Sequence, residues 1–125
     1  FQLVISYNPG YQSLMKDLKQ STKQRFGGLD FDYPEEKIEI NIVSKESGVD
    51  VATAEKLVQI AHRARNLKGH GLDEGISTRL LVYSGQLIAK GVSPLEACSM
   101  TMVTPLTDDP DMRDTLNAAV ETFFG

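Results

Sequence analysis

The stretch Gly75-Ile76-Ser77-Thr78-Arg79-Leu80-Leu81-Val82-Tyr83 has the pattern of a helix start that carries an arginine. Ser77 or Thr78 is placed to cap the helix by accepting a hydrogen bond from a free backbone N–H. Arg79 then falls in the first turn, where the positive end of the helix dipole disfavours a cation by roughly a few tenths of a kcal/mol. An arginine beside unpaired N–H groups suits an anion such as phosphate. The simpler interpretation is a solvent-exposed arginine whose placement costs little.

Two helices are predicted before this stretch. Pro34-Glu35-Glu36 favours a helix start, because proline suits the first position and acids suit the first turn. The isoleucines of residues 38–42 alternate and would also fit a strand, but the acidic start favours a helix that ends near Gly48. Asp50 can cap the second helix, which should end near residue 68. Its predicted apolar stripe consists of Leu57, Val58, Ala61 and Ala64.

The helix that begins at Ser77 should end at Gly91, and two more starts follow it. Ser93-Pro94-Leu95-Glu96 combines a capping box with a proline at the first position, and this helix should end before Pro105. Asp108-Asp109-Pro110-Asp111 starts the last helix. The predicted inward faces are Leu80, Ser84, Leu87 and Ile88 in the helix from Ser77, and Met112, Leu116, Val120 and Phe123 in the last one.

Residues 1–33 have a different pattern. The β-branched and aromatic residues of 1–7 predict a buried strand, and the alternation of 29–33 predicts a half-buried one. A short helix at 13–18 and a single turn at 21–26 are expected between them. A buried strand needs neighbours on both sides, so we expect the N-terminal part of a longer chain to precede Phe1. The predicted fold is therefore mainly α: a helical bundle at 34–125, preceded by two strands and connectors.

Composition limits the classes of function. The 125 residues include 41% apolar and 24% charged side chains, and the net charge is −4, which argues against a general nucleic-acid or membrane-surface binder. No apolar run approaches the roughly 20 residues of a membrane span. The single cysteine, Cys98, lies in an apolar helical pattern, so it is predicted to be a core residue, and it fits a reducing, cytoplasmic location.

Three polar residues stand at positions that suit a functional site. Asn8 follows the first predicted strand, where open α/β sheets place ligand groups, Arg25 lies in a connector beside a double glycine, and Arg79 opens a helix. Each also has a structural explanation, as a turn cap, a surface ion pair and an exposed cation, respectively. His62 and His70 lack partners at metal-ligand spacing, so no metal site is predicted: His62 is expected to be a partly exposed helix residue, and His70 a loop residue.

Four blocks occur in an order that resembles one family: Ser6-Tyr7-Asn8-Pro9-Gly10-Tyr11, Ser21-Thr22-Lys23-Gln24-Arg25-Phe26, Gly75-Ile76-Ser77-Thr78-Arg79-Leu80-Leu81 and Pro105-Leu106-Thr107-Asp108-Asp109-Pro110. The chain resembles the C-terminal part of MoxR-type AAA+ ATPases, in particular the CbbQ/NirQ/NorQ group. The resemblance implies that residues 1–33 end an α/β P-loop core and that residues 34–125 form the AAA+ helical lid domain.

The resemblance also implies roles for the three polar residues. Asn8 matches sensor 1, which orients the attacking water, and Arg25 matches the arginine finger, which reaches the nucleotide of the neighbouring subunit. Arg79 matches sensor 2, which contacts the nucleotide from the lid. The chain contains no GxxxxGK[ST] phosphate loop (Walker A) and no magnesium-binding acid pair (Walker B), so it is predicted to be inactive as an ATP hydrolase by itself.

For the full-length protein, the resemblance implies ATP and Mg²⁺ as cofactors. It also implies a ring of about six subunits, a hexamer, that acts in a chaperone-like way. The implied partners are a von Willebrand factor A-type protein and a client, either a metalloenzyme such as nitric oxide reductase in denitrification or Rubisco. The alternative is a free-standing helical protein-interaction module without nucleotide binding. No tightly bound cofactor is expected on this chain.

Overall fold

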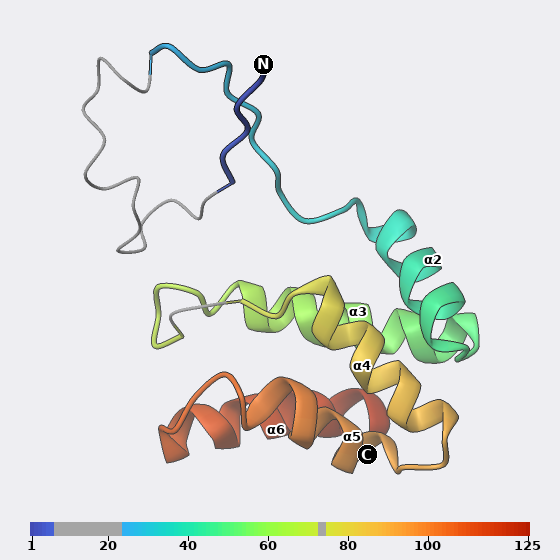
Figure 1. Cartoon of the computed structure of the whole chain (residues 1–125). Helices are drawn as coiled ribbons and strands as arrows, with labels where there is room; N and C mark the ends of the chain where they lie inside the picture. Colours follow the sequence, from blue (N-terminus) through green and yellow to red (C-terminus); the bar gives the residue numbers. More distant parts are fainter. Residues whose placement is uncertain (7–23, 73–74) are drawn as a thin grey trace. The chain divides into compact units, whose positions relative to one another are not determined.

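The computed structural model describes residues 1–6, 24–72 and 75–125 (Figure 1). The chain divides into two units, Phe1–Asp32 and Tyr33–Gly125, and each is described by itself. The described part of the second unit is helical, which confirms the mainly α fold class. Its elements are α2 (Glu36–Ser47), α3 (Val51–Arg65), α4 (Thr78–Ala89), α5 (Pro94–Cys98), the π-helical turn η2 (Ser99–Val103) and α6 (Pro110–Phe124).

The two predicted strands do not form in the described residues. Residues 1–6 and 29–33 have no regular secondary structure, and residues 1–6 and 24–33 are exposed. Alternation of apolar residues produces a strand only where backbone N–H and C=O groups find a partner strand, and no described segment pairs with either stretch. Residues 24–26 form a turn, and residues 21–23 of the single helical turn predicted at 21–26 lie outside the described residues. The predicted helix at 13–18 lies outside the described residues.

The helices α3, α4, α5 and α6 begin at their predicted capping residues, whereas α2 begins at Glu36 with Glu35 as its N-cap, so Pro34 is not its first residue. Asp50, Ser77, Ser93 and Asp109 each accept a hydrogen bond from a backbone N–H in the first turn of the helix that follows. The segment with alternating isoleucines is helical, and it ends at Gly48, whose φ of 87° is left-handed and therefore suits glycine. The strand alternative for this segment is thus excluded.

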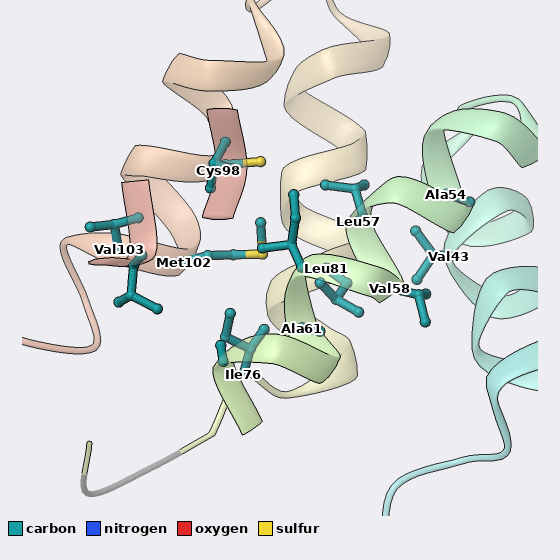
Figure 2. Packing of buried hydrophobic residues seen from close by; sticks show 14 of the residues in the cluster. Val43, Ala54, Leu57, Val58, Ala61, Ile76, Leu81, Cys98, Met102 and Val103 are labelled. Atoms are coloured by element: carbon teal, nitrogen blue, oxygen red, sulfur yellow. The ribbon is translucent and has the colours of Figure 1, made fainter. Parts of the chain in front are cut away.

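The core forms where four parts of the helical unit meet. Figure 2 shows side chains of α2, α3, α4 and the α5–η2 segment packed together, among them Val43, Leu57, Leu81 and Met102. In Figure 1, α6 lies beside α3, and the two helices pack against each other. The buried residues confirm the predicted stripe of α3 and the predicted burial of Cys98. They include Leu57, Val58, Ala61, Ala64, Cys98, Leu116 and Val120.

The predicted inward face of α4 is correct only in part. Ser84 is fully buried, but Leu80, Leu87 and Ile88 are only partly buried, and Leu81 and Gly85 lie inside instead. The cause is the close approach of α2, because a Cβ at Gly85 would lie 2.6 Å from the Cβ of Ser47. The end of α3 also differs from the prediction: the helix stops at Arg65, and turns follow it.

Candidate functional site

The predicted start of α4 is confirmed in detail. Ser77 is the N-cap, its Oγ accepts a hydrogen bond from the backbone N–H of Leu80 at 3.3 Å, and α4 begins at Thr78. Arg79 is therefore in the first turn, and its side chain is exposed. It has no hydrogen-bond or ion-pair partner among the residues that the structure describes. The guanidinium of Arg79 is thus available to an external anion.

The other two predicted site residues belong to the first unit. Arg25 is exposed and lies in the turn of residues 24–26. Asn8 lies outside the described residues. Because the two units are described separately, the relation of Asn8 and Arg25 to Arg79 stays a prediction.

A buried carboxylate lies behind the first turn of α4. Glu39 of α2 is completely inaccessible to solvent, and its two oxygens accept hydrogen bonds from Arg65. The distances are 2.8 Å from Nη1 of Arg65 to Oε1 and 2.6 Å from Nη2 to Oε2. The hydroxyl of Thr78 donates a third hydrogen bond to Oε2 at 2.7 Å. Glu39 therefore joins three segments: α2, the last turn of α3 and the first residue of α4.

Arg65 uses its remaining groups on the segment that enters α4. Its Nε donates to the carbonyl oxygen of Ile76 at 2.8 Å, and its guanidinium lies 3.7 Å from the centre of the Tyr33 ring. Only 9% of its side chain is exposed. We call Glu39, Arg65, Thr78 and the Ile76 carbonyl the Glu39 network. A planar, charged fork matches a carboxylate in this bidentate way, whereas a lysine would not.

Three cations lie at or just after the end of α3, and Arg65 differs from Arg63 and Lys68 because its side chain is not solvated. Arg63 and Lys68 are exposed, and Arg63 lies 4.8 Å from the centre of the Phe123 ring. Arg65 points instead into the helical unit, where Glu39 balances its charge. Cations suit the negative end of the α3 dipole, but the local sequence does not identify the buried partner of Arg65, which lies 26 positions away.

The electrostatics of the Glu39 network favour the ion pair. Burial alone would raise the pKa of Glu39, but hydrogen bonds from Arg65 and Thr78 and the nearby charge of Arg65 outweigh it, and the pKa lies below its ordinary value of 4.5.

His62 is partly exposed, as predicted, and its Nε2 lies 4.0 Å from Oε1 of Glu39. His70 is an exposed residue of the turns after α3, also as predicted.

The segment that leads into α4 contains Gly75 at a place with no room for a side chain. A Cβ there would lie 2.6 Å from the hydroxyl oxygen of Tyr33 and 3.2 Å from Cγ of Arg65. The chain that leads into α4 is thus pressed against the Tyr33–Arg65 stack. This contact and the Glu39 network together fix the position of the first turn that carries Arg79.

The described residues give two further limits. They contain no group of three or more His, Cys, Asp or Glu side chains that could hold a metal ion. None of the helices in the described part of the chain is long and apolar enough to cross a bilayer.

Comparison with known proteins identifies the family. The chain is 68% identical over 124 residues to Protein CbbQ of Hydrogenophilus thermoluteolus, which covers 99% of this chain and 46% of that protein. It is 46% identical to Protein NorQ of Paracoccus denitrificans (100% and 46%) and 50% identical to the denitrification regulatory protein NirQ of Pseudomonas aeruginosa (88% and 42%). The chain thus spans somewhat less than half the length of these relatives. The family described as "CbbQ/NirQ/NorQ C-terminal" matches residues 39–123, and the chain belongs to it.

Proposed function

We propose that this chain is the sensor and lid part of an AAA+ ATPase that uses ATP hydrolysis to remodel or activate a partner enzyme. The observation that carries the proposal is the exposed guanidinium of Arg79 on the first turn of α4. A guanidinium beside free helix N–H groups has the chemistry to contact the phosphates of a nucleotide. Membership of the CbbQ/NirQ/NorQ family supports the same role.

The buried groups behind Arg79 also support this role. A residue that senses a phosphate must hold its position when the nucleotide changes, so its helix needs a rigid base. The Glu39 network supplies such a base, because the first residue of α4 is hydrogen-bonded to a carboxylate on another helix. A solvated arginine without a function would need no such arrangement.

The proposal extends to the whole protein as follows. Asn8 orients the attacking water, Arg25 acts as the arginine finger towards a neighbouring subunit, and ATP with Mg²⁺ binds to a part of the protein outside this chain. The active form is a hexameric ring in the cytoplasm. It works with a von Willebrand factor A-type partner on a client metalloenzyme or Rubisco. The relatives bear both kinds of name, Protein CbbQ at 68% identity and denitrification regulatory protein NirQ at 50%, and the proposal therefore includes both client classes.

The test compares ATP turnover and nucleotide binding in the full-length protein. R79A should lower kcat roughly tenfold or more, because a cation that stabilises phosphoryl charge is lost. R25A should lower kcat while a fluorescent ATP analogue still binds, because an arginine finger acts across subunits. K37A removes an exposed cation from α2 and should leave turnover unchanged.

Two results would count against the proposal. If R79A hydrolyses ATP like the unmodified protein, Arg79 is an ordinary surface residue and the interaction-module alternative gains support. If residues 1–125 alone hydrolyse ATP at the full-length rate, the nucleotide site does not depend on a separate phosphate-binding part.

A further inference from the structure

Arg65 makes several polar contacts around the start of α4. It donates two hydrogen bonds to Glu39 and one to the carbonyl of Ile76, and it stacks on Tyr33. None of these contacts is made with a neighbour in the same helix. An arginine that only balanced the dipole of α3 would need none of them.

The hydrogen bonds of Arg65 converge on the residues just before Arg79. Ile76 lies three positions before Arg79 and accepts from Nε, and Thr78 lies one position before it and shares the Oε2 atom of Glu39 with Arg65. The segment 76–78 is thus held at its backbone and at a side chain. Because helices are stiff over one turn, the direction of the first turn of α4 follows from these two attachments.

We propose that Arg65 is a positioning residue for Arg79, and this inference rests on the proposed function. Arg65 sets the place and direction of the first turn of α4 through Glu39, Thr78 and the Ile76 carbonyl, and so aims the Arg79 guanidinium at the nucleotide phosphates. Arg65 itself touches no nucleotide. Its stack on Tyr33, the first residue of the helical unit, ties the same turn to the point where this unit begins.

Arg63 offers a matched control on the same helix. Both arginines lie in the last turn of α3, and both lie over an aromatic ring, Tyr33 for Arg65 and Phe123 for Arg63. Only Arg65 bonds to Glu39 and to the segment that enters α4. Replacing each arginine by lysine keeps the charge but removes the planar fork, so the two variants differ mainly in the effect on α4.

The experiment is a double-mutant cycle on ATP turnover by the full-length protein, with R65K, R79A and R65K/R79A. R65K should lower turnover roughly threefold to tenfold, because small misplacements of a phosphate-contacting group are costly. The loss should divide between kcat and KM in the same proportion as in R79A. In the R79A background, R65K should change turnover by less than about twofold, because the guanidinium that Arg65 positions has been removed. R63K should match the unmodified protein.

Hydrogen exchange in the same full-length variants gives a reading that does not depend on turnover. R65K should increase the exchange rate of the Leu80 and Leu81 amides in the first turn of α4 and leave the amides of α6 unchanged. T78V removes a single hydrogen bond to Glu39, and it should act in the same direction with a smaller effect. It serves as the test variant if R65K does not fold.

The outcomes separate the two proposals. If R79A lowers turnover but R65K lowers it by the same factor with and without Arg79, then Arg65 has only a general structural role and the inference fails alone. It also fails alone if R65K has no effect on turnover. If R79A has no effect, the proposed function fails, and the inference fails with it.

Discussion

The Glu39 network makes a strong prediction for the variant Glu39→Gln. The substitution keeps the shape of the side chain and one acceptor oxygen but removes the negative charge. Arg65, with 9% of its side chain exposed, would then be a cation without an anion. Breaking a buried ion pair from one side costs about 3–5 kcal/mol. Since the glutamine oxygen still accepts one of the hydrogen bonds, we expect the lower end, about 3 kcal/mol.

That loss is large compared with the stability of a domain of this size. A helical unit such as 33–125 has a free energy of unfolding of about 5–14 kcal/mol. Each kcal/mol lowers the Tm of such a domain by about 4–8 °C, so E39Q should lower the Tm by more than about 10 °C. The assay is thermal unfolding followed by circular dichroism at neutral pH. The matched control is Glu46→Gln, an exposed glutamate of the same helix, which should change the Tm little.

The effect of E39Q on the Tm should depend on pH, and the pKa of Glu39 determines the direction of that dependence. The pKa of Glu39 in the folded state lies below its ordinary value of 4.5, so the carboxylate binds its proton less readily than in the unfolded chain. Its stabilisation is therefore fully present above the unfolded pKa and is lost as the pH falls through the folded pKa. The difference in Tm between the unmodified protein and E39Q should narrow in acid. A difference of only a few degrees at neutral pH, equal to that of the Glu46 control, would refute the reasoning.

Two further predictions concern the core. Gly85→Ala should destabilise the unit by about 1–3 kcal/mol in urea unfolding, because the new Cβ would lie 2.6 Å from the Cβ of Ser47. Gly28→Ala, where a Cβ meets no atom within 4 Å, is the control, and equal stability of the two variants would contradict the packing. Burial raises the pKa of the Cys98 thiol to about 12, so alkylation should be slow in the folded protein and fast in urea. Equal rates in the two conditions would show that the thiol is accessible.

The helix starts were predictable because their signals are local. Asp50, Ser77, Ser93 and Asp109 each bond to a backbone N–H only two or three residues ahead, so the sequence within one turn contains the cause. The placement of Arg79 in the first turn of α4 follows from the same signal. This part of the candidate site therefore needed no knowledge of the tertiary structure.

The strands and the inward face of α4 depend on partners elsewhere in the chain. A run such as residues 1–7 forms a strand only beside another strand, and its own residues do not specify one. In α4, leucine and valine occupy three successive positions, 80–82, so periodicity did not single out Leu81 as the buried residue. The packing of α2 against α4, where Gly85 meets Ser47, decides which side is inside.

The pairing of Glu39 with Arg65 joins residues 26 positions apart, and the pairing with Thr78 spans 39 positions. No periodicity within one helix could reveal either pair. A weak signal did exist: Glu39 lies four positions before the buried Val43, and Arg65 lies four positions after the buried Ala61. Each charge thus extends a buried stripe at the end of a helix, where a charge alone would be costly. An ion pair between the two side chains explains why opposite charges extend the buried stripes of two successive helices. The same ion pair holds the first turn of α4, which carries Arg79.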